Sequence, residues 1–220
     1  KAYANLEIGD LSIEQITDHL EHFPNRYFAH SGKEEVALHL SMTVRFRQES
    51  LEETVDPEHL AVVEWRDDLR RSLTIVNVVT KDRPGLFEKV AGAFAITGMN
   101  ILGARAFTRS DEVAIDVFFV EKAELAIGAN ETETRQVFES TLSDLLAGRN
   151  SPEPLIREHR RKLDGRTPLT PNDRLGATIA PNVDVYRDEV AGRTIVEIRA
   201  ADRPGLLHLI AKNISDCGLD

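Results

Sequence analysis

One five-residue motif, Asp-Arg-Pro-Gly-Leu, occurs twice in this chain of 220 residues, at Asp82–Leu86 and at Asp202–Leu206. The two copies lie 120 residues apart, and the match continues upstream, where Thr74–Val76 corresponds to Thr194–Val196. A shared offset without a gap indicates one structural unit that is made twice. The repeat therefore constrains the fold more strongly than any other feature of the sequence.

Each copy of the motif is predicted to lie at the junction between a strand and a helix. Residues Leu73–Thr80 are apolar and β-branched, which is typical of a mostly buried strand. We expect Asp82 at the N-cap of the following helix and Pro84 near its first turn, where the missing N–H costs nothing. Gly85 allows a close approach of the backbone to a neighbour or a ligand, and Gly98 is expected to end the helix.

The rest of the unit is predicted from the spacing of apolar residues. Two further strands and an amphipathic helix follow the motif helix, at Asn100–Thr108, Val113–Glu121 and Thr132–Leu146. A strand also precedes each motif strand, at Val62–Arg66 and Val183–Tyr186, so each copy begins with a hairpin. We therefore expect an α+β fold built from circularly permuted ferredoxin-like units, in which the leading strand replaces a final strand. That strand must then lie antiparallel to the motif strand.

The chain divides into four predicted parts. They are a helical connector at residues 1–57, a first module at 58–148, a linker at 149–181 and the start of a second module at 182–220. The connector is predicted to hold two helices, Ile13–Phe23 and Lys33–Arg47. The linker is rich in prolines and charges and is expected to be exposed. By comparison with the first copy, we expect the second module to need roughly forty to fifty further residues.

Composition favours an intracellular regulatory protein. The net charge of −10 argues against a nucleic-acid partner, because phosphate binding needs a clustered basic face. The single cysteine, Cys217, excludes an internal disulfide framework and suits a reducing cytoplasm, and we expect its thiol to be at least partly buried. No stretch of about 18 apolar residues is present, so no membrane-spanning segment is predicted.

The motif and the order of elements resemble an ACT domain, the small βαββαβ regulatory module of amino-acid metabolism. The Asp-Arg-Pro-Gly-Leu turn after the first strand is the usual signature of that family. The resemblance implies a ferredoxin-like fold and a role in binding small molecules rather than in catalysis.

Two modules behind a helical segment resemble the C-terminal part of the bifunctional uridylyltransferase/uridylyl-removing enzymes, which modify the nitrogen-signalling protein PII. The resemblance rests on Phe23–Phe28 with the helix that follows, on the Glu64–Asp67 segment, and on a repeat spacing too long for bare tandem ACT domains. It implies glutamine as the small-molecule ligand, PII as the partner of the parent enzyme, and Mg²⁺ as the parent's cofactor.

In ACT domains generally, ligands lie between two modules, in contact with the motif turn and the start of the next strand. The resemblance therefore implies these ligand-binding candidates: Asp82, Arg83, Pro84, Gly85, Leu86 and Asn100, with Asp202, Arg203, Pro204, Gly205, Leu206 and Asp220 in the second copy. A free amino acid is a zwitterion. Backbone N–H groups at the positive end of a helix suit its carboxylate, and a side-chain oxygen of Asp82 or Asn100 suits its ammonium or a side-chain amide.

No catalytic, metal or cofactor site is expected in these 220 residues. The nucleotidyltransferase domain of the similar enzymes carries a Gly-Ser turn before an Asp-x-Asp pair, and their hydrolase domain carries adjacent His-Asp ligands; neither pattern occurs here. Asp18-His19 has the reverse order and is expected on a solvated helix face. Arg83 and Arg203 are expected to be exposed or salt-bridged, and surface pairs of this kind add only about 0–1 kcal/mol.

Two other functions fit the same residues. The motif also makes a good helix cap, so the modules could bind no metabolite and instead dimerise the protein or dock it against other domains, since sheets with apolar strands pair readily. Alternatively, the same modules could serve a (p)ppGpp synthetase/hydrolase or a stand-alone ACT-repeat regulator. The helical connector favours the uridylyltransferase resemblance over these.

Overall fold

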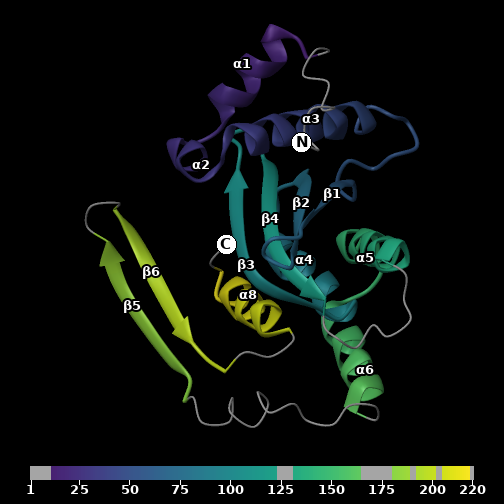
Figure 1. Ribbon diagram of the computed structural model, residues 1–220, viewed down its shortest axis with the longest axis vertical. Helices are drawn as coiled ribbons and strands as arrows, with labels where there is room; N and C mark the ends of the chain where they lie inside the picture. Colours follow the sequence, from purple (N-terminus) through teal and green to yellow (C-terminus); the bar gives the residue numbers. More distant parts are fainter. Residues whose placement is uncertain (1–10, 123–130, 165–179, 189–191, 202–204, 219–220) are drawn as a thin grey trace.

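The computed structural model describes residues 11–122, 131–164, 180–188, 192–201 and 205–218 of the chain (Figure 1). Its centre is an antiparallel sheet in the order β1-β2-β4-β3. The strands are β1 (Ala61–Asp68), β2 (Leu73–Lys81), β3 (Met99–Thr108) and β4 (Val113–Lys122). Within the described residues, a second sheet pairs β5 (Asn182–Asp188) with β6 (Arg193–Arg199).

The leading strand pairs as the permuted fold requires. β1 lies antiparallel to the motif strand β2, with Val62 opposite Val79, and β5 lies antiparallel to β6. With β1 in the place of a final strand, the order β1-β2-β4-β3 is the order of a ferredoxin-like sheet. The predicted α+β fold and its permutation are therefore confirmed for the first module.

Helices cover one face of the sheet and form its larger core. α4 (Leu86–Ile96) and α5 (Glu131–Leu146) pack against the even-numbered residues of β2 and β4, such as Val76 and Phe118. Phe94 links the layers, with its ring centroid 5.0 Å from that of Phe118 and 4.3 Å from that of Phe138. Each such fully buried aromatic side chain contributes about 1.5–3 kcal/mol through loss of water contact.

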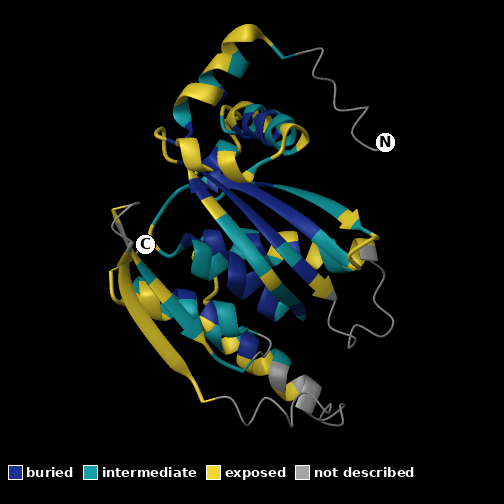
Figure 2. Ribbon diagram, turned by 60° about the vertical axis from the view of Figure 1, so that its left-hand side comes forward, coloured by how far each residue is buried: buried dark blue, intermediate teal, exposed yellow. Residues whose placement is uncertain are grey.

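The connector helices cover the opposite face. α3 (Lys33–Glu49) packs against β1 and β2, where the core contains Val62, Val79 and Ile115. Because both faces are covered, the central strands are buried throughout, whereas the β5–β6 hairpin exposes much of its surface (Figure 2). This double coverage explains why the apolar run of β2 does not alternate with polar residues.

A chain of buried hydrogen bonds joins the connector to the sheet. His19 Nε2 lies 3.3 Å from Tyr27 Oη, which lies 2.9 Å from His39 Nδ1, and His39 Nε2 lies 3.0 Å from Asn77 Oδ1. His19 is only 1% exposed, so the expectation of a solvated face for Asp18-His19 is wrong for the histidine. Burial, with the nearby positive charge of Arg109 as a second cause, lowers the pKa of His19 to about 3.

Arg109 fastens the first connector helix to the β3–β4 turn. Its buried guanidinium donates to Asp18 on α1 (Ile13–His22) and to Asp111, each over 2.8 Å. Burial raises the pKa of Asp111, but hydrogen bonds from Arg109 and Arg47 outweigh this and hold that pKa at about 2. The sequence did not predict the short helix α2 (Asn25–His30). This helix places the buried Tyr27 between His19 and His39 in the chain of hydrogen bonds.

The segment predicted as an exposed linker is partly packed. It contains α6 (Pro152–Asp164), which buries Pro152 and Ile156 and packs on α4. A Cβ at Gly92 of α4 would lie 2.8 Å from Pro152 Cβ, so only glycine allows this approach. The expectation of exposure is therefore wrong for α6, while the boundaries of the linker stay a prediction.

The motif helix of the second copy, α8 (Leu206–Asp216), packs on the motif helix of the first, α4. Cys217 follows α8 and is exposed, contrary to the expected partial burial. No helix among the described residues is long and apolar enough to cross a membrane.

Candidate functional site

Both motif turns place a glycine at the N-cap. Gly85 precedes α4 with φ +73°, and Gly205 precedes α8 with φ +77°. This left-handed conformation costs a residue with a side chain about 1–2 kcal/mol, which explains the glycine at this point in both copies. The expected N-cap role of Asp82 is therefore wrong. The Asp82 backbone N–H instead donates to the carbonyl oxygen of Glu112 over 2.7 Å, which ties the turn to the β3–β4 hairpin.

Arg83 is partly buried and is not salt-bridged to any residue that the structure describes, contrary to the expectation that it is exposed or salt-bridged. Its Nη1 donates to the carbonyl oxygen of Leu146 over 3.4 Å, while Nε and Nη2 are buried without a hydrogen-bond partner among the described residues. Burial lowers the pKa of Arg83. The side chain of Arg83 thus caps the C-terminal end of α5, and it does not line the pocket described below.

The two motif helices meet in an antiparallel arrangement. A Cβ at Gly85, before α4, would lie 3.5 Å from Ser215 Oγ in the last turn of α8. A Cβ at Gly92 would lie 3.3 Å from Nδ1 of His208, in the first turn of α8. The start of each helix therefore lies beside the end or middle of the other.

This packing relates the two copies by a local two-fold axis. At the 120-residue offset, Ser215 corresponds to Ala95 and Gly205 to Gly85. Ala95 and Gly205 line one pocket together, which is the reciprocal of the contact between Gly85 and Ser215. Each motif turn therefore meets the far end of the other copy's motif helix.

The pocket at one of these meeting points encloses about 280 Å³. Its walls come from one face of α4 between Phe87 and Ala95, from the first half of β3 and from the start of α8. Among the predicted site residues, Asn100, Gly205 and Leu206 line it together. The first-copy candidates Asp82, Arg83, Pro84, Gly85 and Leu86 do not line it. Asp202, Arg203, Pro204 and Asp220 lie outside the described residues.

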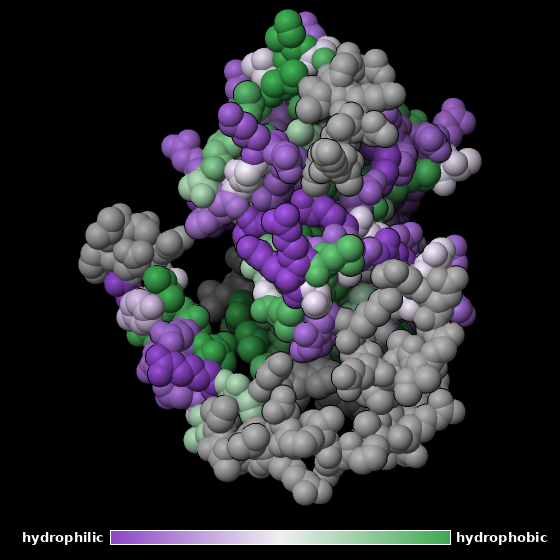
Figure 3. Space-filling view, in the orientation of Figure 1, coloured by the Kyte–Doolittle hydropathy of each residue, from purple (hydrophilic) through white to green (hydrophobic). Residues whose placement is uncertain are grey.

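The pocket combines apolar walls with a few polar groups. Phe87, Met99 and Ile210 are among its apolar lining residues, and apolar side chains gather in the hollow between the β5–β6 hairpin and β3 (Figure 3). The polar groups are the side chains of Asn100 and His208 and the backbone at the start of α8. The N-cap of α8 is Gly205, which has no side chain to cap the helix, and the positive end of a helix favours an anionic group.

Sequence reasoning missed two polar residues near the motif turns. His208 lines the pocket, and the repeat offset could have singled it out as the counterpart of Glu88. Asp116, on β4, is 4% exposed, and burial, with the charge of Asp82 as a second cause, raises its pKa to about 7. The signal that could have found Asp116 is that it is the one charged residue in the apolar run Val113–Val120.

Residues 74–139 match the ACT domain family, and they coincide with the motif strand, α4, β3, β4 and part of α5. Together with the ferredoxin-like sheet, this match defines the region as an ACT domain.

Individual proteins of similar sequence point to one group of enzymes. The chain is 36% identical over 155 residues to the bifunctional uridylyltransferase/uridylyl-removing enzyme of Rhodospirillum rubrum, covering 70% of this chain and 16% of that enzyme. The enzyme of the same name from Phenylobacterium zucineum is 36% identical over 146 residues, covering 66% of this chain and 14% of the enzyme. The enzyme of the same name from Azospirillum brasilense is 29% identical over 163 residues, covering 74% of this chain and 17% of the enzyme.

The chain therefore carries an ACT regulatory domain related to these enzymes, and it spans about one sixth of their length. No solved structure matches the chain significantly.

Proposed function

We propose that the chain is the amino-acid-sensing part of an enzyme that uridylylates and deuridylylates PII, and that glutamine binds in the pocket between the two repeat copies. The observation that carries this proposal is the pocket itself. Three candidates from different copies, Asn100 with Gly205 and Leu206, line one cavity of about 280 Å³. A cavity of this size is near the small end of those that hold small molecules.

The chemistry of the pocket suits a free amino acid. The start of α8 presents backbone N–H groups at a positive helix end, which favours the α-carboxylate. Asn100 offers an amide on the opposite wall for the ammonium or for the amide of a glutamine side chain. The apolar wall that includes Phe87 and Met99 would contact the methylene groups between them.

Such a ligand would act by holding the two copies together. It contacts the end of α4 and the start of α8 at once, so it binds more tightly when these elements are packed than when they separate. A ligand shifts a conformational equilibrium only through such a difference in affinity, and the coupling is typically about 1–3 kcal/mol. In the proposed parent enzyme, a cytoplasmic protein that uses Mg²⁺, this shift would favour removal of UMP from PII over its attachment.

A second function, as an interaction module, is favoured by one surface. Cross-strand pairs place Val183, Val185, Val196 and Ile198 on one face of the β5–β6 hairpin. Val183 and Val185 are 58% and 64% exposed. A second chain or another domain would gain by covering this face, and the modules would then act in dimerisation or docking. An origin in a (p)ppGpp enzyme has no comparable support, because the relatives named above are uridylyltransferases.

Isothermal titration calorimetry, in which glutamine is added to the chain, tests the sensing proposal. Saturable heat is expected for glutamine, with weaker or no heat for glutamate, asparagine and leucine. The substitution Asn100→Ala should weaken binding, whereas Asn25→Ala, on α2, should leave it unchanged. Absence of heat with all common amino acids, together with a concentration-dependent change in mass by light scattering, would replace the sensing proposal with the interaction module.

A further inference from the structure

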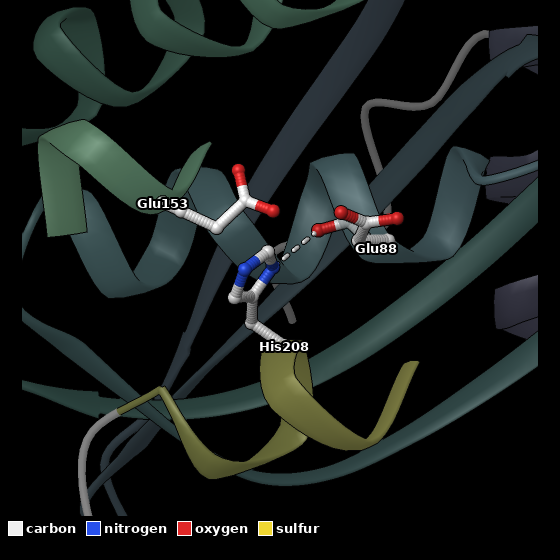
Figure 4. Close-up of side chains that lie close together, drawn as sticks. All are labelled: Glu88, Glu153 and His208. Atoms are coloured by element: carbon white, nitrogen blue, oxygen red, sulfur yellow. Dashed lines mark hydrogen bonds between the residues drawn. The ribbon is translucent and has the colours of Figure 1, made fainter. Parts of the chain in front are cut away.

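Three helices bring one imidazole and two carboxylates together beside the pocket. Glu88 comes from α4, Glu153 from the first turn of α6, and His208 from the first turn of α8 (Figure 4). One ring nitrogen of His208 and one carboxylate oxygen of each glutamate lie within 4.8 Å of one another. Sequence reasoning expected no metal site, because the three residues are far apart in the chain and follow no short ligand spacing.

A hydrogen bond orients the ring of His208. Its Nδ1 lies 3.1 Å from the carbonyl oxygen of Glu88, and because a carbonyl can only accept, Nδ1 carries the proton. This leaves Nε2 as the ring nitrogen that can offer a lone pair to a cation, and it makes no hydrogen bond to any described residue. The side chain is only 5% exposed. A backbone carbonyl that fixes the tautomer in this way is the usual outer partner of a metal-binding histidine.

We propose that Glu88, Glu153 and His208 bind a divalent transition-metal ion, for which Zn²⁺ is the best fit. One imidazole nitrogen and two carboxylate oxygens are a donor set that Zn²⁺ accepts, with water in the fourth position. Metal–ligand distances of about 2.0–2.2 Å would place the donors about 3.4 Å apart. The separations between the three atoms therefore need to shorten by at most about 1.4 Å, which rotation of the two glutamate side chains can supply. Mg²⁺ and Ca²⁺ fit less well, because both prefer oxygen ligands alone.

A lysine is paired with one of the two carboxylates of the cluster. Lys212 Nζ lies 3.4 Å from Glu153 Oε1, and it also lies 3.0 Å from Asp216 Oδ2. Because Asp216 remains as a partner for Lys212, the ion can displace the ammonium from Glu153 without leaving it unpaired. The positive charge of Lys212 repels the metal ion, so the lysine lowers the affinity of the site for it.

A bound ion would join three helices. It would connect α8 of the second copy to α4 and α6 at the local two-fold axis, where Glu88 and His208 are equivalent positions of the repeat. His208 also lines the pocket, so the ion would fix one wall of that cavity. The inference does not depend on which ligand the pocket binds.

Zn²⁺ titration of the metal-free 220-residue chain, in competition with a chromophoric chelator, tests the proposal. One Zn²⁺ per chain is expected, with at least tenfold weaker binding for His208→Gln and for Glu153→Gln. Lys212→Gln should tighten binding severalfold, because it removes the opposing charge. His59→Gln is the matched control, since His59 is a partly exposed histidine paired with Asp56 outside the cluster, and its affinity should not change.

Several outcomes would overturn the proposal. They are an absence of Zn²⁺ binding by the native chain, equal affinity in the native chain and Glu153→Gln, or a preference for Mg²⁺ over Zn²⁺. Because His208→Gln could disturb the packing of α8, its circular dichroism and unfolding midpoint are measured in parallel. Glu153→Gln keeps its shape on the first turn of α6 and provides the decisive comparison even if His208→Gln unfolds.

Discussion

His208 Nδ1 lies 3.1 Å from the carbonyl oxygen of Glu88, and these two residues hold the same position in the two copies of the repeat. Equivalent positions can meet in this way only where a two-fold axis relates the copies. The contact therefore explains why each motif turn faces the far end of the other motif helix. It also places the pocket and the Glu88–Glu153–His208 cluster at the same junction.

The left-handed motif turn predicts a measurable cost for any side chain at Gly85. A Cβ there meets no atom closer than 3.5 Å, so the cost of Gly85→Ala comes from the φ of +73° rather than from a clash. We expect a loss of about 1–2 kcal/mol in the free energy of unfolding, measured with urea. Gly32→Ala is the control, because Gly32 has open space around it and an extended conformation. Equal stability of the Gly85→Ala variant and the native chain would show that the turn relaxes.

Contact between α4 and α6 predicts a local effect of Gly92→Ala. The new Cβ would lie 2.8 Å from Pro152 Cβ, so α6 must move away even though alanine favours a helix over glycine by about 1 kcal/mol. Hydrogen exchange followed by mass spectrometry should show faster exchange in α6, with exchange in β2 and β4 unchanged. Unchanged hydrogen exchange in α6 would mean that α4 and α6 lie farther apart at Gly92 and Pro152 than in the structure.

Asp116 predicts that stability falls as the pH rises. Its pKa of about 7 in the folded chain exceeds the ordinary value of 3.8, so ionisation favours the unfolded chain. The stabilising effect of the neutral acid is complete below pH 3.8 and is lost between pH 3.8 and about 7. Asp116→Asn should therefore stabilise the protein at pH 8 by on the order of 4 kcal/mol and have little effect at pH 4. Urea unfolding at the two pH values checks this, and equal effects at both would contradict it.

His19 predicts the opposite dependence at the other face of the sheet. Its pKa falls from 6.5 to about 3 on folding, so the unfolded chain binds a proton that the folded chain excludes. The stability that neutral His19 provides is present above pH 6.5 and is lost as the pH falls toward 3. His19→Gln should flatten this part of the pH profile of thermal unfolding. A profile with the same slope as that of the native chain would show that His19 is protonated in the fold.

The ion pairs of Arg109 predict a large loss on its removal. Arg109→Ala would leave Asp18 and Asp111 without their buried partner, which typically costs about 3–5 kcal/mol. Arg199→Ala provides a control, because its pair with Glu197 is largely exposed and should contribute less than about 1 kcal/mol. Denaturant midpoints of the two variants measure the contrast. Similar midpoints would show that the contact between α1 and the β3–β4 turn adds little.

The sheet could be predicted from sequence because its signals are local. Apolar, β-branched runs separated by short polar turns gave the four strands of the first sheet to within one or two residues, and the repeat gave β5 and β6. α6 was missed because its prolines favoured an exposed linker, although proline is common in the first helical turn, where Pro152 lies. α2 was missed because a helix of 6 residues leaves little periodic pattern.

The candidate site could be predicted only in part. The family resemblance pointed to Asn100, Gly205 and Leu206, which the structure brings together. It also pointed to the first motif turn, which lies elsewhere because antiparallel packing of α4 and α8 moves Gly85 to the opposite end of the helix pair. Neither Glu153 nor the burial of Arg83 has a local signal, since both depend on where α5 and α6 pack.

The central claim is that one amino acid binds between the two repeat copies. Correlation spectra of the ¹⁵N-labelled chain during titration with glutamine test it most directly. We predict that the amide signals of Asn100, Gly103, Gly205 and Leu206 shift along one saturation curve, while those of Gly32 and Gly148 remain in place. Absence of shifts at saturating glutamine, or shifts confined to the Asp82–Gly85 turn, would contradict the account.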